Sequence, residues 1–211
     1  MSLLKTMNKH FSLAEIQTWD RFTRANFINT LTGFKSLSLI GTVNKAGESN
    51  VAVFSNIVHL GADPALIGFI NRPLEAAPHT LQNIQETGFF TVNLVTESMY
   101  KQAHQTSAKY ADGVSEFEMT GLTEQFREGC SAPFVAESPV QYLLKLEQVI
   151  PIELNGTFLV IGSLQAAYVP ADIQEEDGFL DLAKAGILTS LGTSGYYKTE
   201  KIDNLPYAKV N

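Results

Sequence analysis

The sequence predicts a mainly β fold, an antiparallel Greek-key barrel with helices inserted between some of its strands. About six segments show the alternation or the apolar content of strands. Tight turns join several of them, and Asn44-Lys45-Ala46-Gly47 and Asn155-Gly156 are the clearest hairpin signals. No G-x-G-x-x-G motif follows a strand, which argues against a Rossmann domain. Strands joined largely by hairpins close most simply into a barrel.

The first segment, residues 1–31, is expected to be helical and to precede the barrel. Ser12 and Glu15 have the spacing of a capping box at a helix start. Trp19, Phe22 and Phe27 suggest one buried side. We therefore expect residues 1–211 to form a single domain with an N-terminal helical extension.

The expected strands are residues 34–43, 50–59, 65–70, 89–95, 140–150 and 157–169. Pro151 should interrupt or end the fifth of them. Ser55 and Asn56 lie in the middle of the second, which is otherwise apolar. Buried polar side chains need partners, so this pair either bonds to neighbouring backbone or faces a polar ligand.

Two further segments lack a clear strand pattern. Residues 115–122 are expected to be irregular or weakly extended, with Glu116 and Glu118 on a solvated face. Residues 189–197 are rich in small side chains and are expected to form a loop that ends in aromatic residues.

A short helix is predicted between the third and fourth strands. Pro78 suits its first turn and Gly88 the position just past its end. The first N–H groups of a helix have no internal partner and attract anions. Arg72, His79 and Thr80 lie at or just before this start, so the stretch is a candidate phosphate seat. The alternative is an ordinary capped surface helix with an arginine nearby.

Composition excludes several other classes of protein. The formal charge of −7 and the lack of a Lys/Arg run argue against a nucleic-acid partner. Cys130 is the only cysteine, so no intrachain disulfide is possible, and we interpret it as a bystander in a reducing compartment. No motif has metal-ligand spacing, and no apolar run is long enough for a bilayer span or a signal peptide core. A cytoplasmic protein without a metal site is expected.

Several motifs, in this order and at this spacing, resemble those of the flavin reductase-like, FMN-binding split-barrel family. The matching pieces are residues 50–56, 62–69, 79–84, 87–94, 114–118, 121–123 and 136–140, within a region from Gly33 to Tyr197. The stretches 24–29 and 33–36 are similar to one branch of that family.

This resemblance implies a six-stranded antiparallel split barrel that works as a homodimer, with FMN near the subunit interface. It also implies a set of cofactor-binding residues, some along the isoalloxazine ring and some at the phosphate: Asn50, Val53, Phe54, Ser55, Asn56, Arg72, His79, Thr80, Asn83, Thr106 and Ser107. The chain departs from the family twice. Pro78-His79-Thr80 stands where members often carry Lys-Asp-Thr, and residues 191–195 lack the arginine and paired glycines of many members.

The function that the resemblance implies is an NAD(P)H-dependent oxidoreductase of the flavin-reductase type. The redox chemistry would then belong to the flavin, and we assign no catalytic residue. Lys35 could lie near the flavin, but it is equally a surface lysine at a strand start. Two alternatives remain: a non-enzymatic FMN-binding or electron-carrier protein, and a flavin-free split barrel that serves as an interaction module.

Overall fold

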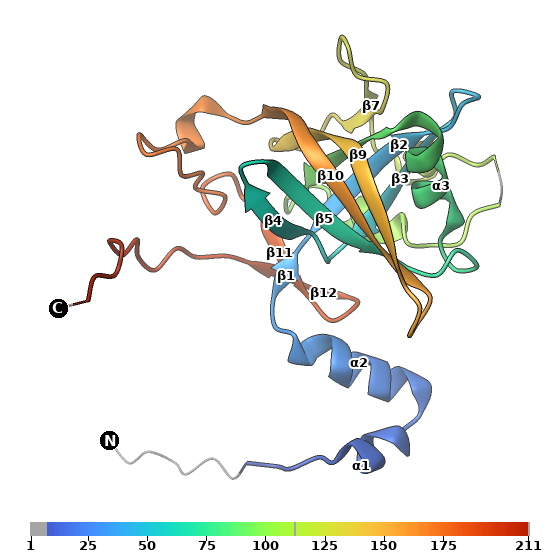
Figure 1. Ribbon diagram of the computed structural model, residues 1–211, viewed down its shortest axis with the longest axis vertical. Coiled ribbons are helices and arrows are strands. Elements are labelled where there is room, and N and C mark those ends of the chain that lie inside the picture. Colours follow the sequence, from blue (N-terminus) through green and yellow to red (C-terminus); the bar gives the residue numbers. More distant parts are fainter. Residues whose placement is uncertain (1–7, 112, 211) are drawn as a thin grey trace.

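The structure is a computed structural model that describes residues 8–111 and 113–210. Two helices precede the first strand, and the other helices lie between strands (Figure 1). The helices are α1 (Leu13–Gln17), α2 (Arg21–Leu31), α3 (Pro78–Thr87), α4 (Tyr100–Gln105), α5 (Glu116–Thr120) and the 3-10 helix η1 (Ala171–Ile173). The strands are β1 (Lys35–Ser36), β2 (Ser38–Val43), β3 (Ser49–Phe54), β4 (Val58–Ala62), β5 (Ala65–Asn71), β6 (Phe89–Leu94), β7 (Glu124–Gln125), β8 (Phe134–Val135), β9 (Gln141–Ile152), β10 (Thr157–Tyr168), β11 (Leu188–Leu191) and β12 (Gly195–Lys198).

Seven strands form the main sheet in the order β3-β2-β6-β9-β10-β5-β4, and every neighbouring pair is antiparallel. Its two outermost strands, β3 and β4, are separated in sequence only by Ser55, Asn56 and Ile57. Such a short connection keeps the two edges close, so the sheet curls into a barrel that is split between β3 and β4. The prediction of a mainly β, antiparallel split barrel is confirmed.

Each of the six expected strands is present, and two of them are broken. The segment 34–43 divides into β1 and β2, and the segment 50–59 divides into β3 and β4 at Ser55–Ile57. The prediction that Pro151 interrupts or ends its strand is wrong, because β9 continues to Ile152 and Pro151 pairs with Phe158. The hairpin turn at Asn155-Gly156 is confirmed, with Gly156 at a φ of 71°.

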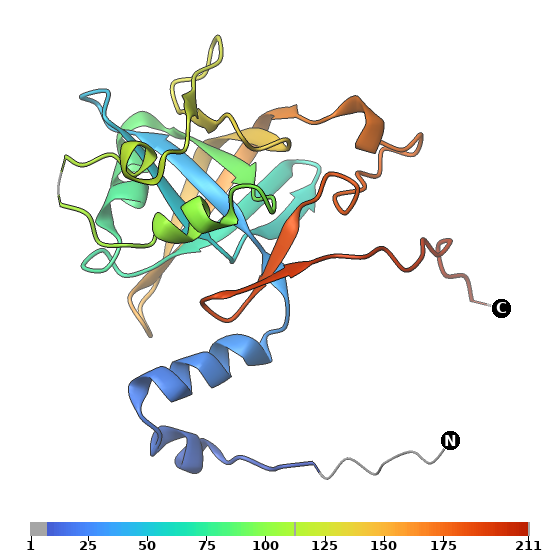
Figure 2. The ribbon, with the colours of Figure 1, turned by 180° about the vertical axis from the view of Figure 1, so that it is seen from behind.

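Two expectations for the less regular segments are also wrong. Residues 116–120 are helical, and Glu116 is buried rather than solvated, whereas Glu118 is exposed. Residues 189–197 are not a loop: β11 and β12 form a hairpin there, and β11 pairs with β1 in a small three-stranded sheet. Figure 2 shows this hairpin in red, beside the chain that leads out of α2.

Two apolar cores lie on either side of β2. Leu39 packs in one cluster with residues of α4 and α5, among them Ala103 and Phe117. Its neighbour Ile40 points to the other face, into the cluster inside the barrel that α3 closes with Leu81 and Ile84. Because successive side chains of a strand alternate between faces, one strand serves both cores. None of the helices in the described residues has the length and apolar content needed to cross a membrane.

Helices α1 and α2 stand away from the barrel (Figures 1 and 2). The Ser12 side chain accepts a hydrogen bond from the Glu15 N–H at 3.2 Å, as the capping-box spacing predicts. Trp19 and Phe27 pack edge to face at 5.1 Å, but Phe22 is 78% exposed, so its expected burial is wrong. Residues 1–7 of the predicted extension lie outside the described residues.

Candidate functional site

Strand β3 connects the residues that the sequence singled out. Asn50 lies near its start, Val53 and Phe54 at its end, and Ser55 and Asn56 in the connection to β4. The distance along the chain from Asn50 to Asn56 is roughly 20 Å at the usual rise per residue of an extended strand. The expected ring-binding residues and the expected phosphate seat therefore sit towards opposite ends of one strand.

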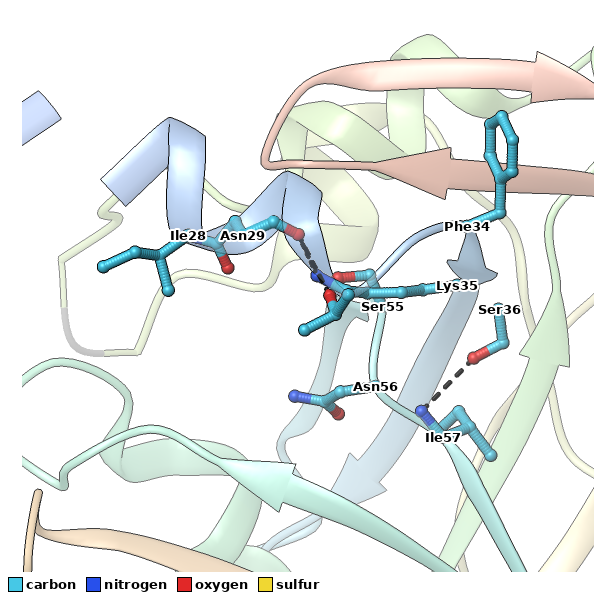
Figure 3. A pocket seen from close by; sticks show the side chains of 9 residues that line it. Ile28, Asn29, Phe34, Lys35, Ser36, Ser55, Asn56 and Ile57 are labelled. Carbon is cyan, nitrogen blue, oxygen red and sulfur yellow. Dashed lines mark hydrogen bonds between the residues drawn. The ribbon is translucent and has the colours of Figure 1, made fainter. Parts of the chain in front are cut away.

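A pocket of about 480 Å³ lies beyond the end of β3. Figure 3 shows its walls, which come from α2, the β1 segment and the β3–β4 connection. Nine residues line it: Ile28, Asn29, Thr32, Phe34, Lys35, Ser36, Ser55, Asn56 and Ile57. Apolar walls with a few polar groups, at this volume, are typical of a small-molecule site.

The polar groups of this pocket differ in what they bind. Asn56 is fixed by two hydrogen bonds to the Ile70 backbone, donating to its oxygen at 2.9 Å and accepting from its N–H at 3.2 Å. The Lys35 ammonium donates to the Asn29 carbonyl at 2.8 Å. The Ser55 hydroxyl makes no hydrogen bond with any other described residue, and it lines the pocket. Of the two possibilities for the polar pair, Asn56 takes the backbone and Ser55 faces the pocket.

The start of α3 has the form expected of an anion seat, although two of its polar residues point inward. Pro78 occupies the first turn, and the Ala77 cap position supplies no side-chain hydrogen bond to it. Thr80 is 4% exposed, and Asn83 is buried and donates to the Thr42 hydroxyl at 3.1 Å. Arg72 is exposed and its guanidinium pairs with no described residue.

Glu116 is a residue of this region that sequence reasoning missed. It begins α5 and lies against the Asn50 amide, whose NH2 group donates to the two carboxylate oxygens at 3.3 and 3.1 Å. The same amide lies 3.5 Å from the Thr80 hydroxyl. Burial raises the pKa of Glu116, against the opposing effects of its own N–H, the Val51 N–H and the nearby His79 imidazole. A buried carboxylate thus joins α5, β3 and the start of α3.

Thr106 and Ser107 lie on the outer edge of β3, at the end of α4. The Thr106 hydroxyl accepts from the Val53 N–H at 3.0 Å and donates to the Ala103 carbonyl at 2.8 Å. The Ser107 hydroxyl donates to the His104 carbonyl at 2.7 Å and is exposed. Thr106 therefore caps a free N–H of an edge strand, which is a structural task in its own right.

A chain of contacts connects the pocket to the start of α3. Asn56 bonds to Ile70, and the next residue, Asn71, donates from its side chain to the Arg72 and Ala77 carbonyls at 2.8 and 3.2 Å. The Asn71 side-chain oxygen is buried and without a partner among the described residues. Phe54, in contrast, points into the barrel core, with its ring 4.9 Å from that of Phe69.

Comparison with known proteins identifies the fold family. Residues 34–197 match the model of the flavin reductase like domain. The chain belongs to the flavin reductase-like family. The matched region starts at the pocket wall, at Phe34, and includes every expected cofactor-binding residue of this flavin reductase-like protein.

Relatives of this flavin reductase-like protein support the same fold. An uncharacterized protein of Halalkalibacterium halodurans is 34% identical over 78% of this chain and 81% of its own. A solved Shewanella frigidimarina structure, described as a candidate flavin reductase with a split barrel domain, is 44% identical, with a TM-score of 0.92 over 95% of this chain and all of that one. Nitrilotriacetate monooxygenase component B of Bacillus cereus is 22% identical, with a TM-score of 0.83 over 94% of this chain and all of that one, and shows the fold alone.

The residues present fit a flavin mononucleotide better than a metal. The pocket offers apolar walls in Ile28, Phe34 and Ile57 for a ring system, and the Lys35 amine and the Ser55 hydroxyl for its polar edge. The uncapped start of α3 and the exposed Arg72 offer donors for a phosphate. No group of three or more His, Cys, Asp or Glu side chains in the described ranges is arranged to hold a metal ion.

Proposed function

We propose that this protein is an FMN-binding oxidoreductase of the flavin-reductase type that accepts hydride from NAD(P)H. The observation that carries the proposal is the 480 Å³ pocket beyond β3, because Ser55, Asn56 and Lys35 all line it. The family resemblance implies Ser55 and Asn56 as flavin contacts, and of the two possibilities for Lys35, near the flavin or on the surface, its place in the pocket wall favours the first. A Thermus thermophilus FMN-binding protein has the same fold, with a TM-score of 0.67 over 82% of this chain and 90% of its own, at 16% identity.

When bound, FMN would supply the hydride-accepting chemistry, and the protein would position it and tune its surroundings. In this proposal Ile28, Phe34 and Ile57 exclude water from one end of the site. The Ser55 hydroxyl donates a hydrogen bond to the polar edge of the ring, and the positive charge of Lys35 favours negative charge nearby.

The other end of the site would hold the phosphate. The N–H groups at the start of α3 carry partial positive charge, Arg72 adds its guanidinium, and the His79 imidazole lies in the same turn. Asn50, Thr80 and Asn83 contribute by shaping this end, since Thr80 lies against Asn50 and Asn83 is held by Thr42. The backbone of Val53 and Phe54, with Thr106 and Ser107 beside it, would form the wall between the two ends, because the side chains of Val53 and Phe54 pack into the two apolar cores.

Flavin retention followed by anaerobic reduction tests the proposal. Purified protein is loaded with FMN, washed by gel filtration and scanned for flavin absorbance, then mixed with NADH or NADPH without oxygen. Retained flavin that bleaches with either nucleotide is the expected result. Retained flavin that does not bleach would favour the non-enzymatic FMN carrier, and the absence of binding in a direct FMN titration would favour the flavin-free interaction module.

A further inference from the structure

Three polar side chains connect the interior of the protein to the start of α3. The Glu116 carboxylate lies 3.1 and 3.3 Å from one end of the Asn50 side-chain amide. The other end of that amide lies 3.5 Å from the Thr80 hydroxyl, in the first turn of α3. Asn50 and Thr80 are only 7% and 4% exposed, so both depend on protein partners for most of their hydrogen bonds.

The direction of these hydrogen bonds depends on whether Glu116 carries a proton. An ionised carboxylate only accepts hydrogen bonds, so it binds the NH2 end of the Asn50 amide. The amide oxygen then accepts from the Val51 N–H at 3.2 Å and faces the Thr80 hydroxyl. Because a hydroxyl has a single proton, a Thr80 that donates to the Asn50 oxygen has none left for a ligand.

A protonated Glu116 reverses these directions. Its O–H group donates to the Asn50 amide oxygen, which requires the amide to turn over. The NH2 end of the amide then donates to the Thr80 oxygen at 3.5 Å. The Val51 N–H keeps an acceptor, because it also donates to Glu116. The Thr80 proton is then available to a ligand at the start of α3.

We propose that Glu116 is a positioning residue of the phosphate seat, which sets the direction of the Thr80 proton through the Asn50 amide. We call these three residues the seat relay. The inference rests on the proposed function, because the FMN phosphate is the ligand of the seat. Phosphate oxygens accept hydrogen bonds, so they are bound when the Thr80 proton is available and opposed by its lone pairs when it is not. FMN binding therefore takes up one proton from solvent, and Glu116 holds it.

Two neighbouring influences act on Glu116 in opposite directions. Burial is the larger one and raises its pKa, because the ionised form loses its water. The His79 imidazole, in the same turn as Thr80, lowers the pKa. A bound phosphate would repel the ionised carboxylate and favour the proton further.

Other charged groups near α5 are few. The helix packs against β3 and α4. Strand β3 has no charged side chain, and three titratable side chains of α4 and α5 are exposed: Lys101, His104 and Glu118. Within the part of the chain that the structure describes, His79 is therefore the only charged side chain among the influences on Glu116.

Glutamine at position 116 gives a quantitative expectation. Its amide stays neutral at every pH and pairs with the Asn50 amide in either direction, so it does not force the Asn50 oxygen towards Thr80. One hydrogen bond to a charged group corresponds to about ten-fold or more in affinity. We expect Glu116→Gln to bind FMN as tightly as the natural chain below pH 4.5, where the carboxyl is protonated, and about ten-fold more tightly at pH 8.

Fluorescence titrations with FMN and riboflavin, from below pH 4.5 up to pH 8, measure this difference. The second ionisation of the FMN phosphate, at a pKa of about 6, is common to all proteins and cancels in the comparison at each pH. Riboflavin lacks the phosphate, so it should bind the natural chain and Glu116→Gln alike. The matched control is Glu118→Gln, which removes an exposed carboxylate from the same helix and should follow the natural chain.

Thr80→Val separates the seat relay from a charge effect through space. Valine has nearly the shape of threonine but no hydroxyl, so T80V and T80V/E116Q should bind FMN equally at every pH. If the gain from glutamine persists without the Thr80 hydroxyl, the relay is overturned. The same holds if the affinity ratio of Glu116→Gln to the natural chain does not change with pH.

A measurement without ligand separates failure of the relay from failure of the proposed function. In the unliganded natural chain, the NMR signals of the Asn50 NH2 group should shift with the same pH midpoint as the Glu116 carboxyl carbon. An Asn50 signal that does not respond to Glu116 ionisation overturns the inference and leaves the proposed function standing. If neither FMN nor riboflavin binds at any pH, the proposed function is refuted together with the coupling to a flavin phosphate.

Discussion

Replacing Glu116 by alanine removes the carboxylate that holds α5, β3 and the start of α3 together. Glu116 is 8% exposed, and its oxygens accept from the Asn50 amide at 3.1 and 3.3 Å, with the Val51 N–H nearby. The substitution leaves the two N–H donors of the Asn50 amide without these acceptor oxygens in a buried region, whereas the Val51 N–H keeps the Asn50 amide oxygen at 3.2 Å. Each orphaned donor costs about 1–3 kcal/mol, so we expect the free energy of unfolding to fall by about 2–5 kcal/mol.

The glutamine variant separates hydrogen bonding from charge. Glu116→Gln keeps an acceptor oxygen, so it should be about as stable as the natural chain below the ordinary carboxyl pKa of 4.5, where Glu116 is protonated in the folded and the unfolded state. Burial raises the pKa of Glu116 above its ordinary value of 4.5, so the folded state holds this proton more tightly than the unfolded chain does. Ionisation of Glu116 therefore costs stability as the pH rises through the folded-state pKa, and the glutamine variant should become the more stable protein above it.

Urea unfolding of the three proteins from below pH 4.5 up to pH 8 measures both effects. For a chain of this size, a loss of 2–5 kcal/mol lowers the melting temperature by roughly 5–15 °C. An alanine variant within about 0.5 kcal/mol of the natural chain would show that the Asn50 amide finds other partners. The glutamine variant and the natural chain should differ in stability by an amount that grows with pH. If this difference does not change with pH, ionised Glu116 does not cost the folded state any stability.

Three further predictions concern the seat, the pocket and the barrel. Arg72→Ala should weaken FMN binding about ten-fold but leave riboflavin binding unchanged, because of the two ligands only FMN carries a phosphate. Fluorescence titrations with both ligands measure this, and Arg21→Ala, at another exposed arginine, is the control. An equal loss of affinity for both ligands would contradict the phosphate seat. Asn56→Ala removes two hydrogen bonds to the Ile70 backbone, so the free energy of unfolding measured in urea should fall by about 1–3 kcal/mol. The same substitution should weaken FMN binding, and an unchanged FMN affinity would place the ligand elsewhere. Gly41→Ala would press a methyl group against the Pro133 carbonyl oxygen, so we expect calorimetry to show a loss of about 1–3 kcal/mol or more in the free energy of unfolding. An unchanged stability would contradict the close packing of β2 against Pro133.

Much of the barrel could be predicted because its signals are local. Apolar alternation identified the six long strands, and Asn155-Gly156 identified the hairpin between β9 and β10. Pro78 and Gly88 predicted the two ends of α3: the helix begins at Pro78, and Gly88 follows its last residue with a φ of 77°. Ser12 caps the Glu15 N–H as its spacing predicted. Each of these features depends on residues within a few positions of one another.

The candidate site was harder to predict, because its decisive contacts join distant parts of the chain. Nothing near Glu116 in sequence indicates burial, and the Asn50 amide that it meets lies 66 positions earlier. Within the break at residues 55–57, Asn56 bonds to the backbone of Ile70, a residue of β5 that lies 14 positions later in the sequence. The small-residue segment 189–197 looks like a loop until β1 supplies a pairing partner for β11.

The sequence by itself determined the strands, their turns, the start of α3 and the family, since backbone periodicity and turn chemistry are properties of short stretches. Tertiary structure decided which polar groups are buried, which of them face a pocket and which helix forms its outer wall. Those outcomes depend on competition among partners brought together by folding, as when Asn56 takes the Ile70 backbone and leaves Ser55 at the pocket. The sequence shows that Ser55 and Asn56 are polar residues between apolar ones, but it does not show which of them bonds to backbone and which faces the pocket.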